Sequence, residues 1–510
     1  MQENSIVSIK TLIHDAVDFN NEYTLPDYIV DVRKLIRCDG KAVLHNVYVN
    51  GDSITFEGEV TYSILVICED DSIRNLIYSE EFMLNGNNTD GCLVFVHECK
   101  LEGLTARLVS PRKLNCRCKA VVYSKNNITE SVSTEYTGID MPGAEHTTER
   151  KLSECSYLTI SESCIQNQHA SRDIELPSDR KEISTIVYCK VNVQINERKI
   201  VEDKLFLRGE TVTEILYEAT QGEYVKYYDR SPFSEVIENS NDSSAHICEV
   251  YVTDVKASVR NNSFGEMRLI ELDYTYGIKC RYYIERKTDV LTDVYSVEYD
   301  VKCETGSVSA LKLNSIFSGS LSFNETCDIE EQFDEVIDCC ATVISTNIGV
   351  DPIGKKVIVT GDIKFDIVYK KEEHGCFSVI KPFKYEREYD GTDSEVYTEY
   401  FVTVQTAMCN IEKDKLLINA EIFFNIMIAQ CCEYEFKENV CFLKSNDNNK
   451  CPVIIYYPAE GDTLWEIAKM YKSTCKDIIS VNSLTSESLE GVKVLLLPKK
   501  RKKSVFNAIL

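Results

Sequence analysis

The sequence lacks the features that mark secreted, membrane and metal-binding proteins. Its first residues contain no basic stretch followed by an apolar segment, so we expect no secretory signal and a cytosolic protein. Residues 420–432 are the most apolar stretch, but polar side chains interrupt it and it is too short for a transmembrane segment. With seven histidines in 510 residues and no Cys-x-x-Cys motif, we also expect no metal site and no cofactor.

Catalytic motifs are equally scarce. Gly354-Lys355-Lys356 lacks the upstream glycine of a phosphate-binding loop, and no Gly-x-Ser-x-Gly occurs. Cys99 lies two residues from His97, but we interpret this pair as a coincidence because the chain has 22 cysteines. We therefore expect no catalytic residues and no enzymatic activity.

Positive charge is in short supply. The chain has 56 basic and 82 acidic residues and a net charge of −26, so we expect no nucleic-acid binding. The excess of acidic residues lies before Pro452, because from Pro452 onward nine basic residues outnumber six acidic ones. We interpret the basic run Lys499–Lys503 as a solvated tail, with a contact to an acidic surface as the functional alternative.

Cysteine, in contrast, is abundant. A chain of this length without an export signal is unlike a small secreted disulfide scaffold. We expect most of the 22 cysteines to be reduced and buried as small apolar residues. Cross-linking after the cell lyses is the alternative.

The segment Val453–Pro498 carries the clearest local pattern, which predicts strand, helix, helix and strand. Thr463 with Glu466, and Thr474 with Asp477, form capping boxes that begin the two helices. One face of the first helix carries apolar residues at helical spacing: Leu464, Ile467, Ala468 and Tyr471. Asn tolerates positive φ, so we expect Asn482 to end the second helix.

This segment resembles a LysM domain. The matching residues are Tyr457, Gly461-Asp-Thr-Leu-Trp465, Ile467-Ala468, Tyr471, Ile478, Asn482, Gly491 and Pro498. The resemblance implies a module that binds N-acetylglucosamine polymers such as peptidoglycan, and sometimes a protein. The expected contact residues are Glu460, Gly461, Asp462, Thr463, Trp465, Lys469, Asn482, Ser483 and Leu484. Trp465 lies off the apolar stripe, so it is either a partly exposed anchor or packs against Pro458.

The rest of the chain contains a threefold repeat. Three similar stretches carry a glycine before a strand-like alternation: Gly58, Gly209 and Gly361. Each is followed 22 to 24 residues later by a phenylalanine: Phe82, Phe233 and Phe383. A further 24 residues on, each copy has an alanine: Ala106, Ala257 and Ala407. These runs of β-branched and aromatic residues predict three equivalent, antiparallel, sandwich-like β domains.

We place the domain boundaries from composition and from the repeat. The three β domains are expected at residues 1–135, 173–296 and 327–444, the LysM domain at 452–498 and a basic tail at 499–510. Linkers are expected around 132–172, 296–326 and 445–450, where Ser, Thr, Asn and acidic residues are frequent. The fold class is therefore mainly β with a small βααβ module.

The body also resembles the SPOCS domains of spore coat proteins. The resemblance lies in Leu25–Leu35, Glu175-Leu-Pro177, Gly265–Arg268 and Leu291–Ser296, together with the glycine strand. The third copy departs from it, with Ile329-Glu330 where the others have Leu-Pro.

SPOCS domains followed by LysM are typical of SipL-like spore coat morphogenetic proteins of clostridia. This resemblance implies a mother-cell protein at the forespore surface and in the spore coat. Its LysM domain would bind the coat-basement ATPase, stage IV sporulation protein A, with other coat proteins as further partners. One alternative is a peptidoglycan-binding protein of the cortex or wall. A wall hydrolase would need a catalytic domain, of which the sequence gives no sign.

Overall fold

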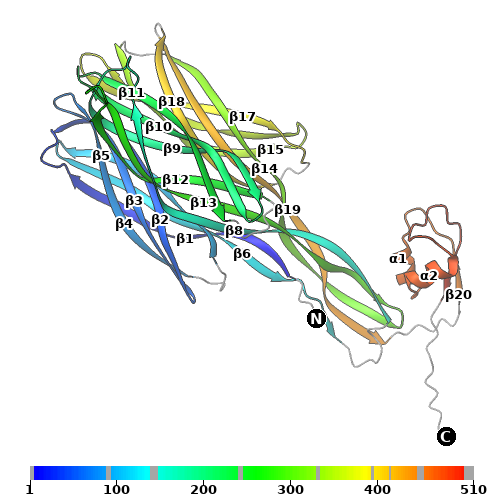
Figure 1. Ribbon diagram of the computed structural model, residues 1–510. Coiled ribbons are helices and arrows are strands. Elements are labelled where there is room, and N and C mark those ends of the chain that lie inside the picture. The colour runs from blue at the N-terminus through cyan, green and yellow to red at the C-terminus, as the bar shows by residue number, and fades with distance from the viewer. Residues whose placement is uncertain are drawn as a thin grey trace.

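The computed structural model describes residues 5–87, 94–137, 147–238, 245–328, 333–391, 396–412, 415–444 and 453–498. Strands account for 80% of the chain and helices for 4%, which confirms the mainly β fold class. The strands form three sandwiches, and a small helical module follows them (Figure 1). We call the sandwiches unit 1 (Ser5–Ser131), unit 2 (Thr148–Ser296) and unit 3 (Tyr299–Lys444).

Unit 1 contains two three-stranded antiparallel sheets. The first has the order β1 (Ser5–Thr24), β6 (Lys113–Ser131), β5 (Val94–Ser110), and the second β2 (Val32–Asn50), β3 (Ser53–Cys68), β4 (Ile73–Asn87). Side chains of β3 alternate between the core and the opposite face over most of its length, as a strand of a sandwich requires. Phe56 and Tyr62 of β3 pack with Leu114 and Ala120 of β6 in one apolar core.

Units 2 and 3 have the same arrangement of six strands. Unit 2 consists of β8 (Thr148–Glu175), β9 (Ile183–Val201), β10 (Lys204–Ala219), β11 (Tyr224–Glu238), β12 (Ala245–Asn261) and β13 (Met267–Ser296), paired in the orders β12-β13-β8 and β11-β10-β9. Unit 3 consists of β14 (Tyr299–Asp328), β15 (Glu335–Asp351), β16 (Lys356–Lys370), β17 (His374–Glu388), β18 (Val396–Glu412) and β19 (Lys415–Lys444), paired as β14-β19-β18 and β15-β16-β17. Each unit has its own apolar core between its two sheets.

The landmark glycines lie at corresponding places in the three units. Gly58, Gly209 and Gly361 are each the sixth residue of the middle strand of the second sheet. Each pairs directly with the landmark phenylalanine of the next strand: Phe82, Phe233 and Phe383. A Cβ at Gly361 would lie 2.1 Å from the carbonyl oxygen of Ser345 and 2.7 Å from Cζ of Phe383. Glycine is therefore needed where the ring and the neighbouring strand approach the backbone.

Two of the predicted linkers are wrong. Residues 148–172 form most of β8, which pairs with β13, and residues 299–326 form most of β14, which pairs with β19. The strands of unit 2 thus begin before the predicted boundary at residue 173, and those of unit 3 before residue 327. The third predicted linker, 445–450, lies outside the described residues, as do Ile329-Glu330 and the basic tail.

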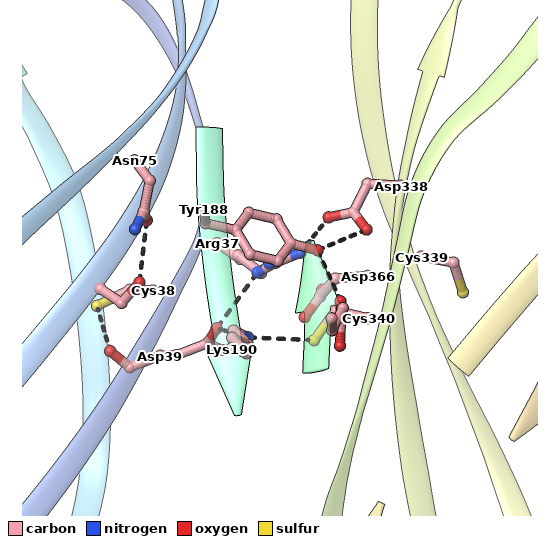
Figure 2. Close-up of polar contacts among 12 residues, drawn as sticks. Arg37, Cys38, Asp39, Asn75, Tyr188, Lys190, Asp338, Cys339, Cys340 and Asp366 are labelled. Atoms are coloured by element: carbon pink, nitrogen blue, oxygen red, sulfur yellow. Dashed lines mark hydrogen bonds and ion pairs between the residues drawn. The ribbon is translucent and has the colours of Figure 1, made fainter. Parts of the chain in front are cut away.

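The three units pack against one another through both of their sheets, and the second sheets meet at one repeated position. One cysteine in each unit pairs with the isoleucine six residues after the glycine: Cys38, Cys189 and Cys339. The residues just before these cysteines, Arg37, Tyr188 and Asp338, are therefore equivalent. Arg37 Nη1 donates to Asp338 Oδ2 at 2.7 Å, and Tyr188 Oη donates to Asp338 Oδ1 at 2.9 Å (Figure 2). Because equivalent residues meet, the units surround an approximate threefold axis.

Charges are balanced at this junction. Lys226 Nζ lies 2.8 Å from both Glu214 and Asp338, and Lys190 Nζ lies 2.8 Å from Asp39. With Arg37, the cluster has three cations and three carboxylates. Burial opposes ionisation of Asp338, but Lys226 and Arg37 outweigh it and hold the pKa of that carboxyl well below its usual value. The charges are thus neutralised in pairs, as a buried cluster requires.

The long strands continue beyond the sandwiches as an arm that points toward the C-terminal module (Figure 1). Val290 of β13, Val308 of β14 and Phe436 of β19 pack together in it. A short strand, β7 (Glu135–Thr137), joins in parallel beside residues 439–441 of β19. The hairpin between β13 and β14 lies in the same region as these strands, and the C-terminal module packs against it.

Most described cysteines are buried or half-buried, and none of them forms a disulfide. Those that are exposed are Cys164, Cys303 and Cys431. Burial raises the pKa of the Cys155 thiol to about 11 and that of Cys189 to about 12. Both values leave little reactive thiolate at neutral pH.

We therefore expect a native chain to react slowly with a thiol reagent. In a variant with Cys92 and Cys451 (both outside the described residues) replaced by serine, Cys164, Cys303 and Cys431 should react first, and the other thiols after denaturation. Thiol counting with and without denaturant measures this. Rapid labelling of more than half of the thiols in the folded chain would contradict the expectation.

Candidate binding site of the C-terminal module

The C-terminal module has the predicted strand, helix, helix, strand order. Its elements are β20 (Val453–Tyr456), α1 (Leu464–Met470), α2 (Cys475–Asn482) and β21 (Leu495–Pro498). Thr463 and Thr474 cap the helices, because their hydroxyls accept bonds from the backbone N–H of Glu466 and Asp477 at 3.3 and 3.0 Å. Both threonines therefore begin the helices as predicted, and the βααβ module is confirmed.

The predicted apolar stripe forms the core of the module. Leu464, Ile467 and Ala468 are buried, together with Ile478 of α2 and Leu495 of β21. The same core includes two buried side chains of the β13–β14 hairpin: Tyr295 and Val297. The module is thus packed onto the β13–β14 hairpin, a contact that its own sequence pattern did not reveal.

The loop before α1 is held by Asp462. Its Oδ2 accepts a bond from Tyr456 Oη at 2.7 Å and from the backbone N–H of Ala459 at 2.8 Å. The bonds from Ala459 and Tyr456 lower the pKa of this carboxyl. Gly461, at φ +95, completes the turn. Asp462 therefore shapes the loop, and its neighbours Glu460, Gly461 and Thr463 are exposed.

The loop after α2 is held by Asn482. Its Nδ2 donates to the carbonyl oxygens of Ile478 at 2.8 Å and Leu496 at 2.7 Å, and its Oδ1 accepts from the N–H of Leu496 at 2.7 Å. The expectation that Asn482 is the left-handed stop is wrong, since Ser483 takes that conformation at φ 50. The Asn482 side chain instead ties α2 to β21, Ser483 is exposed, and Leu484 packs on the core.

Trp465 and Lys469 contact the body. Trp465 Nε1 donates to Asp293 Oδ2 at 2.7 Å, and Lys469 Nζ lies 2.6 Å from Asp293 Oδ1. The indole meets the Tyr295 ring edge-on, with 5.0 Å between the centroids. Trp465 thus anchors the module to the β13–β14 hairpin of the same chain. The bonds from Lys469 and Trp465 overcome the cost of burial and lower the pKa of Asp293.

The predicted binding residues therefore separate into two groups. Trp465 and Lys469 form what we call the docked face, which lies against the β13–β14 hairpin. The exposed members of the two loops, Glu460, Gly461, Thr463 and Ser483, form what we call the rim. Asp293 and Tyr295 were missed as site residues, because a contact across more than 160 positions leaves no local pattern.

Other kinds of site find little support in the described residues. They contain no group of three or more His, Cys, Asp or Glu side chains that could hold a metal ion. The part of the chain that the structure describes also has no helix long and apolar enough to span a membrane. Burial raises the pKa of the Cys99 thiol to about 12, the opposite of activation.

Comparison with known proteins agrees with both resemblances. The family model described as SipL, SPOCS domain matches residues 182–260, which cover β9 to β12 of unit 2. The LysM domain model matches residues 459–498. The chain is SipL-like, with a SPOCS domain and a C-terminal LysM domain.

Two consequences follow for function. SPOCS and LysM are non-catalytic domain families, and their combination indicates a sporulation-related protein. The LysM domain indicates possible binding to peptidoglycan.

No curated protein and no solved structure gave a significant match.

Proposed function

We propose that this protein is a non-enzymatic spore coat assembly factor. It acts in the mother-cell cytoplasm at the forespore surface, and binds the coat-basement ATPase, stage IV sporulation protein A, through its LysM domain. The observation that carries the proposal is the pairing of a SPOCS match at residues 182–260 with a LysM match at residues 459–498 in one chain.

The distribution of charge supports an acidic protein ligand at the C-terminal end of the chain, where the basic run Lys499–Lys503 follows the LysM domain. The segment from Pro452 onward is net positive, whereas the rest of the chain is strongly acidic. An acidic partner would be repelled by the body and drawn to this end, which steers the encounter. The rim would contact the partner together with Asp462, Asn482 and Leu484, joined by Trp465 and Lys469 of the docked face.

We further propose that all three units are SPOCS-like copies. Support comes from their common strand order and from the shared position of Gly58, Gly209 and Gly361. Three copies around an approximate threefold axis would present three similar outer surfaces to other coat proteins.

A second function is favoured by the LysM match itself. Many LysM domains take N-acetylglucosamine polymers, so binding to peptidoglycan of the spore cortex or wall is the alternative. The two functions differ in the ligand of one module, and they can therefore be separated by a single comparison.

Pulldowns with purified peptidoglycan and with lysate of sporulating cells provide that comparison. We expect the full chain to capture the ATPase from lysate and to retain little peptidoglycan. Truncation after Cys451 should abolish capture and forespore localisation while leaving a folded body, because the three sandwiches have their own cores.

Leu464→Asp removes the module in a second way that keeps the full-length chain. It places a charge in the core of the module, so it should also abolish capture. If the truncated body still surrounds the forespore normally, the adaptor role belongs to the SPOCS-like units instead.

A further inference from the structure

The β13–β14 hairpin is shaped to receive the docked face. The pairing of β13 with β8 shifts register between Leu291 and Asp293, so Thr292 forms a bulge next to Asp293. Bulges re-aim neighbouring side chains, and here the Asp293 carboxylate accepts from two donors of α1. The backbone N–H of Val294 also donates to Asp293 Oδ1, at 2.9 Å, and fixes its rotamer.

The contact extends well beyond one carboxylate. Tyr295 Oη donates to the carbonyl oxygen of Ser473 at 2.9 Å, and Tyr295 and Val297 are 4% and 7% exposed. Lys472 pairs with Asp300 at the start of β14. The hairpin thus holds one face of the module by apolar burial, by an aromatic contact and by two carboxylates.

The chemistry on the two sides is complementary. The docked face presents an indole N–H and the ammonium group of Lys469, and Lys472 of the module adds a second ammonium group; these donors suit carboxylates. The hairpin supplies these carboxylates from the acidic body. Any acidic protein that used Trp465 and Lys469 would therefore compete with Asp293 for the same donors.

We propose that the β13–β14 hairpin is an internal ligand of the LysM domain and closes the docked face against acidic partners. The rim stays exposed in this closed state, so a partner first meets the rim and completes its contact only after the hairpin has been displaced. The competition, although not the docking itself, rests on the function proposed above. A closed state lowers the apparent affinity of a partner by the fraction of molecules that are open.

Trp465 allows the docking to be measured directly, because it is the only tryptophan in the chain. Asp293→Ala in the full chain should shift its emission to longer wavelength and increase its quenching by acrylamide, as the indole is released to water. Asp273→Ala is the matched control, since Asp273 is exposed on the same strand and remote from the module. Unchanged emission in Asp293→Ala would overturn the docking.

Acid offers a second measurement in the wild-type chain. The pKa of Asp293 lies below its ordinary value of 3.8, so the bond is complete above that value and is lost only as pH falls through the lowered pKa. Trp465 emission should therefore stay constant from about pH 8 to pH 5 and change below about pH 4. A transition near pH 6 would overturn the role of this carboxylate.

Binding of the purified coat-basement ATPase tests the closure. We expect Asp293→Ala to bind about tenfold more tightly than wild type, because the competing carboxylate is gone. If the wild-type chain binds the ATPase and Asp293→Ala binds it no more tightly, the closure is overturned. The proposed function would then remain intact. If neither chain binds, the closure and the proposed function both fail, and Trp465 emission alone decides the docking.

Discussion

Asp338→Ala is expected to destabilise the body by about 3–5 kcal/mol, among the largest effects of any single change in this chain. The side chain of Asp338 is fully buried at the junction of the units, where it receives bonds from Arg37 and Tyr188 (Figure 2). Lys226 donates to the same carboxylate. Its removal leaves three cations and two carboxylates in the cluster, so Arg37 and Lys226 each lose one of their two carboxylate partners. An uncompensated buried charge costs far more than a lost surface pair.

Denaturation in urea followed by circular dichroism measures the loss. Hydrogen exchange should show faster exchange in β2, β9 and β15, which meet at Asp338, before the rest of the body opens. Asp334→Ala is the control, since Asp334 is exposed just before β15 and should change stability by less than about 0.5 kcal/mol. Similar midpoints for the two variants would mean that the junction contributes nothing to the association of the units.

The sandwich fold of each unit could be predicted from the sequence, but the contacts between the three units could not. The alternation after Gly58 and Gly361 follows from the two-residue period of a strand, whereas residues 211–217 of β10 are buried on both faces. The junction uses different residues at one repeated position, namely Arg, Tyr and Asp. The three positions are equivalent in the repeat, but their side chains differ. Comparing the three copies with one another could therefore not reveal that these residues contact each other.

The edge strands β8 and β14 were mistaken for linkers because of their polarity. Each lies at the edge of its sheet, so one side of its backbone lacks a partner strand. Polar and charged residues are tolerated there, and they also discourage pairing with other chains. Composition alone therefore could not distinguish a long, polar edge strand from a flexible connection.

The candidate site was predictable only within the module. The helices, their caps and the core residues follow from local spacing, so the order of elements was right. The role of Trp465 was left open, because its partners Asp293 and Tyr295 belong to another unit. Asp462 and Asn482 are predicted contact residues, but their side chains already bond to the backbone and hold the two loops.

Gly361→Ala is expected to destabilise unit 3 by about 3 kcal/mol or more, an over-packing effect that the strand cannot easily relieve. The new methyl group would lie 2.1 Å from the carbonyl oxygen of Ser345 on β15 and 2.7 Å from the ring of Phe383 on β17. The ring could turn aside, but Phe383 is buried in the core of unit 3. The backbone oxygen belongs to a paired strand, so β15 and β16 would have to separate locally.

Gly349→Ala in the same unit is the matched control for this prediction. Gly349 lies on β15, its φ is not positive, and a Cβ there meets no atom within 4 Å. Alanine should therefore be neutral or stabilise by up to about 1 kcal/mol, because it restricts the unfolded chain. Hydrogen exchange of unit 3 and urea denaturation compare the two variants. If both behave alike, close packing of the phenylalanine over the glycine is not what makes the landmark glycine necessary.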